Sequence, residues 1–183
     1  MKRPVAIRNT HPRLRFSRAS VARMIHTLDT AFEKSPLERI GAMRRGVSAV
    51  PAGELSLVFL TDPALAKIHA DFMGDPTATD VITFEGDAAA GLAGEICVSA
   101  DTAARFVNLE GSRPCEPRPA ETRILQNKFS AELTLYLVHG WLHLAGYDDL
   151  QPTKKRKMRA AEKRAMRLLQ AAKAVPGFRL AQL

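Results

Sequence analysis

Apolar and polar residues along the chain follow two periods, one typical of strands and one typical of helices. Runs rich in branched and aromatic residues predict short strands at residues 5–7, 54–60, 80–84 and 94–99. Apolar residues three or four positions apart predict helices at about 17–33, 100–107, 121–144 and 153–172, and Asp62-Pro63 is expected to cap a further helix that ends near Phe72. Because strands and helices interleave, we expect an α+β (mixed α/β) fold, in which a single, mostly four-stranded sheet packs with about five helices.

Two helices in the second half of the chain are expected to have different surroundings. The segment 121–144 has no Pro or Gly before Gly140, and its spaced apolar residues predict a long, buried helix that ends near Gly146. These residues are Leu133, Leu137, Trp141 and Leu144. The last helix is rich in Lys and Arg outside one apolar stripe, which we expect at Met158, Ala161, Ala165, Leu168 and Ala172.

The length of the chain suits one domain. Its 183 residues can bury a sizeable core, so we expect residues 1–183 to form a single domain. Three prolines within nine residues predict a loop at 111–120, and residues 152–183 are expected to form a basic C-terminal helix and tail. No apolar run approaches the roughly 20 residues that span a bilayer, and the basic start has no signal-peptide core, so we expect a cytoplasmic protein.

Charge is distributed unevenly along the chain, although the formal net charge is +8. Residues 1–28 hold seven bases and no acid, and residues 152–183 hold ten bases and one acid, Glu162. The middle of the chain, 29–151, holds ten bases and eighteen acids. An acidic centre between basic ends suits a cation site beside surfaces that attract a polyanion.

The segment 139–149, HGWLHLAGYDD, carries the clearest candidate chemistry. His139 and His143 are four positions apart, so on a helix they share one face and can bind one metal ion. Gly146 can adopt the left-handed conformation that ends a helix and turns the chain back, and the potential ligand Asp149 follows. Asp148 is the alternative to Asp149. Two imidazoles and a carboxylate leave a coordination position for water, as in hydrolytic zinc sites, at the end of a buried helix.

The residue after the first histidine separates two classes of metalloenzyme. The spacing is that of the metzincin zinc motif with Asp in place of the last His. A metalloprotease has a Glu general base directly after the first His, but this chain has Gly140, which disfavours a peptidase. Gly140 also suggests room for a bulky substrate group beside the metal. Cys97 and Cys115 lack the spacing of a thiolate zinc site and are expected to be reduced thiols.

Three motifs together resemble the YbeY family of bacterial rRNA maturation endoribonucleases. They are His139-Gly-x-Leu-His143-Leu-x-Gly-Tyr147-Asp148, TDVITF at 79–84 and Gly94-Glu95-Ile96. The family pattern is HGxLHLxGYDH, TDVLSF and GDI, and the resemblance covers about residues 54–146. It implies a single YbeY-like metallohydrolase domain that acts as a zinc-dependent, single-strand endoribonuclease in small-subunit rRNA 3′-end processing and ribosome quality control. By this resemblance one Zn²⁺ is held at His139, His143 and Asp149, which are also the expected catalytic residues.

The chain departs from the family pattern at two informative positions. Asp149 replaces the third family histidine, which would lower the positive charge of the site and could alter the choice of metal. Met73 stands where the family typically has an arginine associated with activity on RNA, and methionine cannot mimic a bidentate phosphate contact. An alternative is therefore a non-catalytic, metal-containing factor for ribosome assembly or rRNA binding.

Further residues are expected to bind substrate or line the cleft: Thr79, Asp80, Glu95, Lys154, Lys155 and Arg156. Simpler interpretations stay open, because Thr79 and Asp80 could cap a strand, Glu95 could be a surface carboxylate and the basic run could be a solvated helix face. The resemblance implies rRNA and the small ribosomal subunit as partners, with a small-subunit ribosomal protein and an Era-type GTPase, and no membrane. Binding to RNA phosphates would be strongly salt-dependent.

Overall fold

The strands form one four-stranded mixed sheet and a separate two-stranded sheet. The computed structural model describes residues 2–33, 50–110 and 119–181. The larger sheet has the order β1-β3-β5-β4, with β1, β3 and β5 parallel and β4 antiparallel at one edge. Its strands are β1 (Val5–Asn9), β3 (Glu54–Leu60), β4 (Val81–Glu85) and β5 (Leu92–Ser99). The pair β2 (Leu14–Arg15) and β6 (Arg179–Leu180) was not predicted, because two-residue strands leave no periodic pattern.

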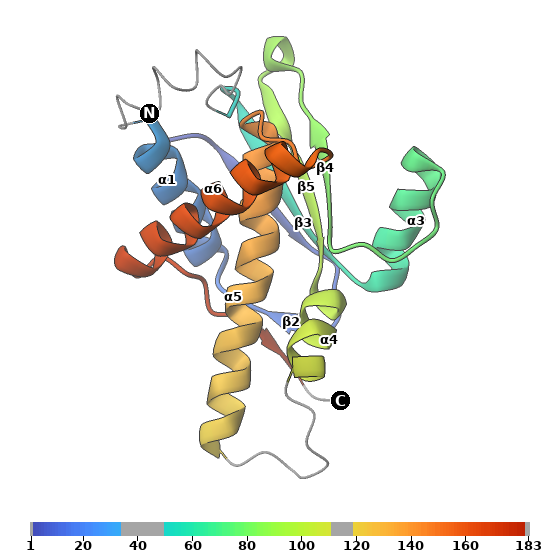
Figure 1. Ribbon diagram of the computed structural model, residues 1–183, viewed down its shortest axis with the longest axis vertical. Helices are drawn as coiled ribbons and strands as arrows, with labels where there is room; N and C mark the ends of the chain where they lie inside the picture. The colour runs from blue at the N-terminus through green and yellow to red at the C-terminus, as the bar shows by residue number, and fades with distance from the viewer. Residues whose placement is uncertain (1, 34–49, 111–118, 182–183) are drawn as a thin grey trace.

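Five α-helices in the described part of the chain surround the larger sheet, so the predicted α+β class is confirmed. They are α1 (Arg18–Glu33), α3 (Asp62–Met73), α4 (Ala100–Glu110), α5 (Pro119–Leu144) and α6 (Pro152–Ala171), with a short 3₁₀ helix η1 (Ala88–Ala90). Helices α1, α5 and α6 lie together on one side of the sheet, whereas α3 lies on the other (Figure 1). None of the helices in this part is both long and apolar enough to cross a membrane.

The strands point alternate residues toward the two faces of the sheet. Leu57 and Ile96 belong to the main core on the side of α5, whereas Val58 and Cys97 contact a smaller cluster beneath α3. Side chains of neighbouring residues in a strand point in opposite directions, so one residue of shift changes the face. This alternation decides which motif residues can reach the end of α5.

Helix α5 is buried on several sides, as predicted. Leu133, Leu137 and Trp141 are almost fully buried, and so are Val138 and Leu142 outside the expected stripe. Trp141 Nε1 donates a hydrogen bond to Asp29 Oδ1 at 3.1 Å. A helix that is apolar nearly all round can be packed between a sheet and other helices.

Three expectations about local structure need correction. The buried stripe of α6 continues from Ala165 to Leu169, four residues later, while Leu168 is 36% exposed and Ala172 is exposed. The side chain of Asp62 does not cap α3; it accepts hydrogen bonds from Thr102 at 2.7 Å and from Ser99 and Arg105. The expected loop at 111–120 ends earlier, because α5 begins at Pro119; residues 111–118, including Cys115, lie outside the described residues.

Candidate metal centre

The end of α5 and the turn after it bring His139, His143 and Asp149 together. The two ring Nε2 atoms are 2.9 Å apart. Asp149 places one carboxylate oxygen 4.0 Å from Nε2 of His139 and the other 3.9 Å from Nε2 of His143. Gly146 has a φ of 86°, and this left-handed conformation ends the helix and turns the chain so that Asp149 can approach the two histidines. The turn is closed by a hydrogen bond of 3.0 Å from Tyr147 N to Leu142 O.

Both imidazoles are oriented by hydrogen bonds on the side of the ring away from the cluster. Nδ1 of His139 lies 2.6 Å from Glu162 Oε1, and Nδ1 of His143 lies 3.1 Å from the carbonyl oxygen of Tyr147. Carboxylate and carbonyl oxygens only accept, so both Nδ1 atoms donate. The Nε2 atoms of both rings are therefore directed toward the same point, as is usual for histidines that ligate a metal.

The two histidines differ in their affinity for a proton. Burial by itself lowers the pKa of His139, but the hydrogen bond and negative charge of Glu162, supported by Asp149 and Asp80, outweigh burial and raise that pKa above its usual value. Burial and the positive charge of His139 lower the pKa of His143, and Asp149 only partly opposes them. His139 therefore holds a proton more tightly than His143, whose Nε2 lies 2.9 Å from that of His139.

The donor set fits a divalent cation. Ligand atoms at about 2.1 Å from a zinc ion are at most about 4.2 Å from one another. The nearest contacts lie within that limit: 2.9 Å between the two Nε2 atoms, 4.0 Å from one Asp149 oxygen to His139, and 3.9 Å from the other Asp149 oxygen to His143. All three residues are partly buried, so the cluster is shielded yet accessible to solvent.

Asp148, the alternative ligand, is engaged elsewhere. Its Oδ2 accepts from Lys154 Nζ at 2.6 Å, and its Oδ1 accepts from Leu150 N at 2.8 Å. These contacts hold the pKa of Asp148 below its usual value, first through the Lys154 hydrogen bond. Among the described residues the metal-binding geometry includes Asp149 and not Asp148.

Gly140 has a packing role that differs from the one expected. A Cβ at this position would lie 2.6 Å from Ile96 Cγ2 and 2.9 Å from Thr83 Oγ1, so the residue faces the sheet. The absence of a side chain lets α5 approach β4 and β5 closely. The expectation that Gly140 leaves room for substrate beside the metal is therefore wrong, because that space is filled by the sheet.

The expected cleft residues lie in different places. Asp80 accepts from Val81 N at 3.0 Å and from Thr79 Oγ1 at 3.3 Å just before β4, and its charge acts on His139. Lys154 bonds Asp148, while Lys155 and Arg156 are exposed at the start of α6, which follows the cluster in the chain.

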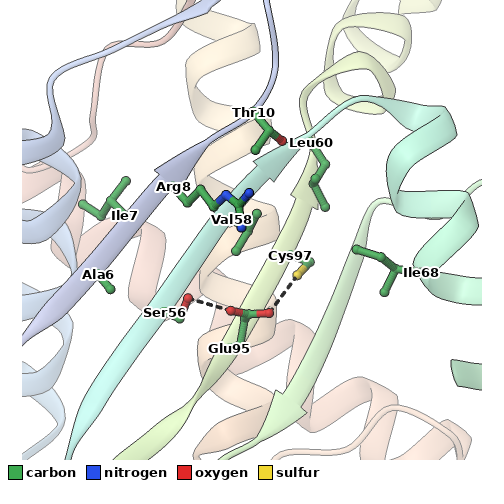
Figure 2. Close-up of a pocket in the computed structure, with 10 residues that line it drawn as sticks. All are labelled: Ala6, Ile7, Arg8, Thr10, Ser56, Val58, Leu60, Ile68, Glu95 and Cys97. Atoms are coloured by element: carbon green, nitrogen blue, oxygen red, sulfur yellow. Dashed lines mark hydrogen bonds between the residues drawn. The ribbon is translucent and has the colours of Figure 1, made fainter.

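Glu95 lies on the opposite face of the sheet from the cluster. Its carboxylate accepts a hydrogen bond from Ser56 Oγ at 2.7 Å and a weak one from Cys97 Sγ at 3.7 Å (Figure 2). These residues line a hollow of about 490 Å³ together with Arg8 and Val58. The structure thus does not bring Glu95 to the metal ligands, because it is the neighbour of Ile96 and points the other way.

Two groups that orient the histidines, Glu162 and the carbonyl of Tyr147, were not predicted from the sequence. The carbonyl of Tyr147 leaves no sequence signal, because every residue has one. Glu162 does stand out in the sequence, because it is the single acidic residue of α6. Its partner His139 is 23 positions away, and only the packing of α6 on α5 brings the two together.

Fold and site together define an α+β protein with a candidate metal centre of two histidines and a carboxylate at the end of a buried helix. The family model for Endoribonuclease YbeY matches residues 27–170, which is well over half of the chain. The chain therefore belongs to the YbeY family.

Similar proteins agree with this assignment. The Endoribonuclease YbeY of Chlamydia pneumoniae is 37% identical over 125 residues, which cover 66% of this chain and 72% of the relative. That of Rhizobium meliloti is 33% identical over 121 residues, or 63% of each chain. A solution structure from Thermotoga maritima matches with a TM-score of 0.51 at 19% identity, covering 92% of this chain and 90% of the other, and supports the fold.

Proposed function

We propose that this protein is a metal-dependent, single-strand endoribonuclease that acts in rRNA maturation, at the 3′ end of small-subunit rRNA, and in ribosome quality control. The convergence of His139, His143 and Asp149 on one point carries the proposal. The relatives named endoribonucleases support the choice of RNA as substrate.

His139, His143 and Asp149 would hold one divalent cation, and zinc suits two imidazoles with a carboxylate. When bound, such a cation acts as a Lewis acid on a phosphoryl oxygen and lowers the pKa of coordinated water. The chain itself supplies the orientation, because Glu162 and the Tyr147 carbonyl direct both Nε2 atoms inward. Asp80 adds negative charge near His139, which favours a cation at the cluster.

The start of α6 is the proposed contact for RNA phosphates. Lys155, Arg156 and Lys157 are exposed, and in the described residues no acidic side chain pairs with them. Lys155 and Arg159 are four positions apart, where like charges repel along a helix, and a polyanion would relieve this repulsion. We propose rRNA in the small ribosomal subunit as the partner, with a small-subunit ribosomal protein and an Era-type GTPase, in the cytoplasm.

A second candidate function is a non-catalytic, metal-containing factor for ribosome assembly. Met73 favours it, since this residue is 57% exposed at the end of α3 and offers no charge to a phosphate. The substitution Met73→Arg tests this candidate. A gain in RNA cleavage without a change in cation affinity would show that the missing guanidinium limits catalysis.

The primary test is cleavage of a single-stranded rRNA 3′ fragment with and without a chelator. We expect the chelator and His143→Ala each to abolish cleavage, while His69→Ala, which removes an imidazole on α3, leaves it intact. Cleavage that resists both the chelator and His143→Ala would remove the metal-hydrolase mechanism. Stoichiometric metal without cleavage would favour the assembly factor.

A further inference from the structure

Helix α6 has one acidic side chain among many basic ones, and that side chain is not used within the helix. Its only acid is Glu162, whereas Lys and Arg dominate the exposed surface. Arg159 and Lys163 are neighbours of Glu162 on the helix, yet in the described part of the chain neither pairs with it. The ion pair of Glu162 is with His139 of α5.

The contact between Glu162 and His139 is short and shielded. Glu162 Oε1 lies 2.6 Å from Nδ1, and the two side chains are 17% and 21% exposed. A hydrogen bond to an ionised acceptor is stronger than a neutral one, and partial burial reduces its screening by solvent. The bond selects the ring form in which Nδ1 carries a hydrogen, so Nε2 is the atom left for a metal.

The packing of α6 determines where Glu162 lies. Met158, Ala161 and Ala165 are buried in the main core, and Glu162 follows Ala161 directly. The hydrophobic contact between α6 and its neighbours therefore positions the Glu162 carboxylate next to His139. By contrast, the corresponding oxygen for His143 belongs to Tyr147, four residues along the same segment.

We propose that Glu162 is a positioning residue of the metal centre, which holds His139 with Nε2 toward the cation and couples the docking of α6 to cation binding. The inference rests on the proposed metal site and extends it to a helix that contributes no ligand. Outer carboxylates of this kind typically change metal affinity by about 10–100-fold when they are removed.

The experiment compares Glu162→Gln, Glu162→Ala and the wild-type protein in competition titrations of Zn²⁺ against a chromophoric chelator. Asp71→Asn is the matched control, because it removes one exposed carboxylate on α3. We expect affinity to fall about 10-fold in Glu162→Gln and up to about 100-fold in Glu162→Ala, with no change in the control. Glu162→Gln keeps the shape and an acceptor oxygen, so it decides the question if Glu162→Ala does not fold.

Two further readouts separate positioning from a merely structural role. Nitrogen-15 NMR of the His139 ring should show Nδ1 protonated in the zinc-bound wild type and a mixture of ring forms in Glu162→Ala. Hydrogen exchange of α6 should slow when Zn²⁺ is added to the wild type, and this protection should shrink in Glu162→Gln.

The outcomes distinguish the two proposals. Wild-type affinity in both Glu162 variants, with zinc still bound by the wild type, would overturn the positioning role and leave the metal centre intact. A wild-type protein that binds no Zn²⁺ would overturn the metal centre and the positioning role together. Weaker binding in both variants, with normal thermal stability of Glu162→Gln, would support the role of Glu162.

Discussion

A cluster of polar side chains that includes a carboxylate lies on each side of the four-stranded sheet. The two clusters differ in the groups that the carboxylates contact. On the side of α5, Glu162 and Asp149 lie beside two imidazoles that point their Nε2 atoms at one another. On the other side, Glu95 meets the hydroxyl of Ser56 and the thiol of Cys97. The first arrangement collects donors for a cation, whereas the second satisfies a carboxylate with neutral groups.

The difference shows how a sheet separates chemistry that is continuous in the sequence. Glu95 belongs to one of the three motifs that indicate the family, yet its neighbour Ile96 is the residue that contacts Gly140 of α5. Substitutions on the two faces should therefore have independent effects, and four experiments test this separation and the packing around it.

The largest expected effect is on the reactivity of Cys97, on the face of Glu95. Burial, followed by the charge of Glu95 and the hydrogen bond to it, raises the pKa of the Cys97 thiol to about 12. At pH 8 the thiol is protonated, so reaction with a disulfide reagent should be suppressed by roughly three orders of magnitude against an unfolded chain. A Cys115→Ser variant leaves only Cys97 to be measured. Fast labelling of the native protein would contradict this environment.

The next effect concerns cation affinity and compares the two faces directly. His143→Ala removes one of three candidate ligands and should weaken Zn²⁺ binding by more than about 100-fold, since even outer partners contribute 10–100-fold. Glu95→Gln changes a carboxylate on the opposite face and should leave the affinity unchanged. Isothermal titration calorimetry of both variants measures the contrast. Equal losses in the two variants would mean that the faces are coupled.

Gly140→Ala tests the close approach of α5 to the sheet. A Cβ 2.6 Å from Ile96 Cγ2 must displace a branched core side chain, so we expect a loss of about 1–3 kcal/mol in the free energy of unfolding. Gly177→Ala is the matched control, because no atom lies within 4 Å of its Cβ position. Urea denaturation measures both. A stable Gly140→Ala protein would show that the helix and sheet can separate at little cost.

The smallest effect concerns Asp62, which joins α3 to α4 away from both clusters. Burial opposes its charge, but hydrogen bonds from Ser99, Thr102 and Arg105 outweigh burial and hold the pKa of Asp62 below its usual value. A lowered pKa contributes stability above the unfolded value, and this contribution is lost as the pH falls through the folded value. We expect Asp62→Asn to cost about 1 kcal/mol at pH 7 and less at pH 3. If urea titrations gave the same loss of stability for Asp62→Asn at pH 7 and pH 3, the stabilising role of the ionised Asp62 carboxylate would be contradicted.

Several elements could be predicted from the sequence because their causes are local. The strand β3 matches the predicted range 54–60, and α5 ends close to Gly146, whose left-handed conformation was expected from its place after the apolar run. The ligands His139 and His143 were found because one helical turn fixes their spacing, and Asp149 because a single turn separates it from the helix.

Other features depend on how separate elements pack. The face on which Glu95 lies depends on the register of β5, and the direction of the Asp62 side chain depends on Thr102 and Arg105 of α4, 40 and 43 residues later. The shift of the α6 stripe from Leu168 to Leu169 depends on where α6 meets α5, because both residues are compatible with a helical period.

Local sequence was enough to identify the three candidate ligands of a cation, His139, His143 and Asp149, since a helix and one glycine turn suffice to gather them. Tertiary packing was needed to show which ring atoms face inward, which face of the sheet holds Glu95 and why position 140 has no side chain. These depend on contacts between elements distant in the chain, above all that of Glu162 with His139. Local backbone geometry is encoded within a few residues, whereas the packing that orients a side chain is set by the whole core.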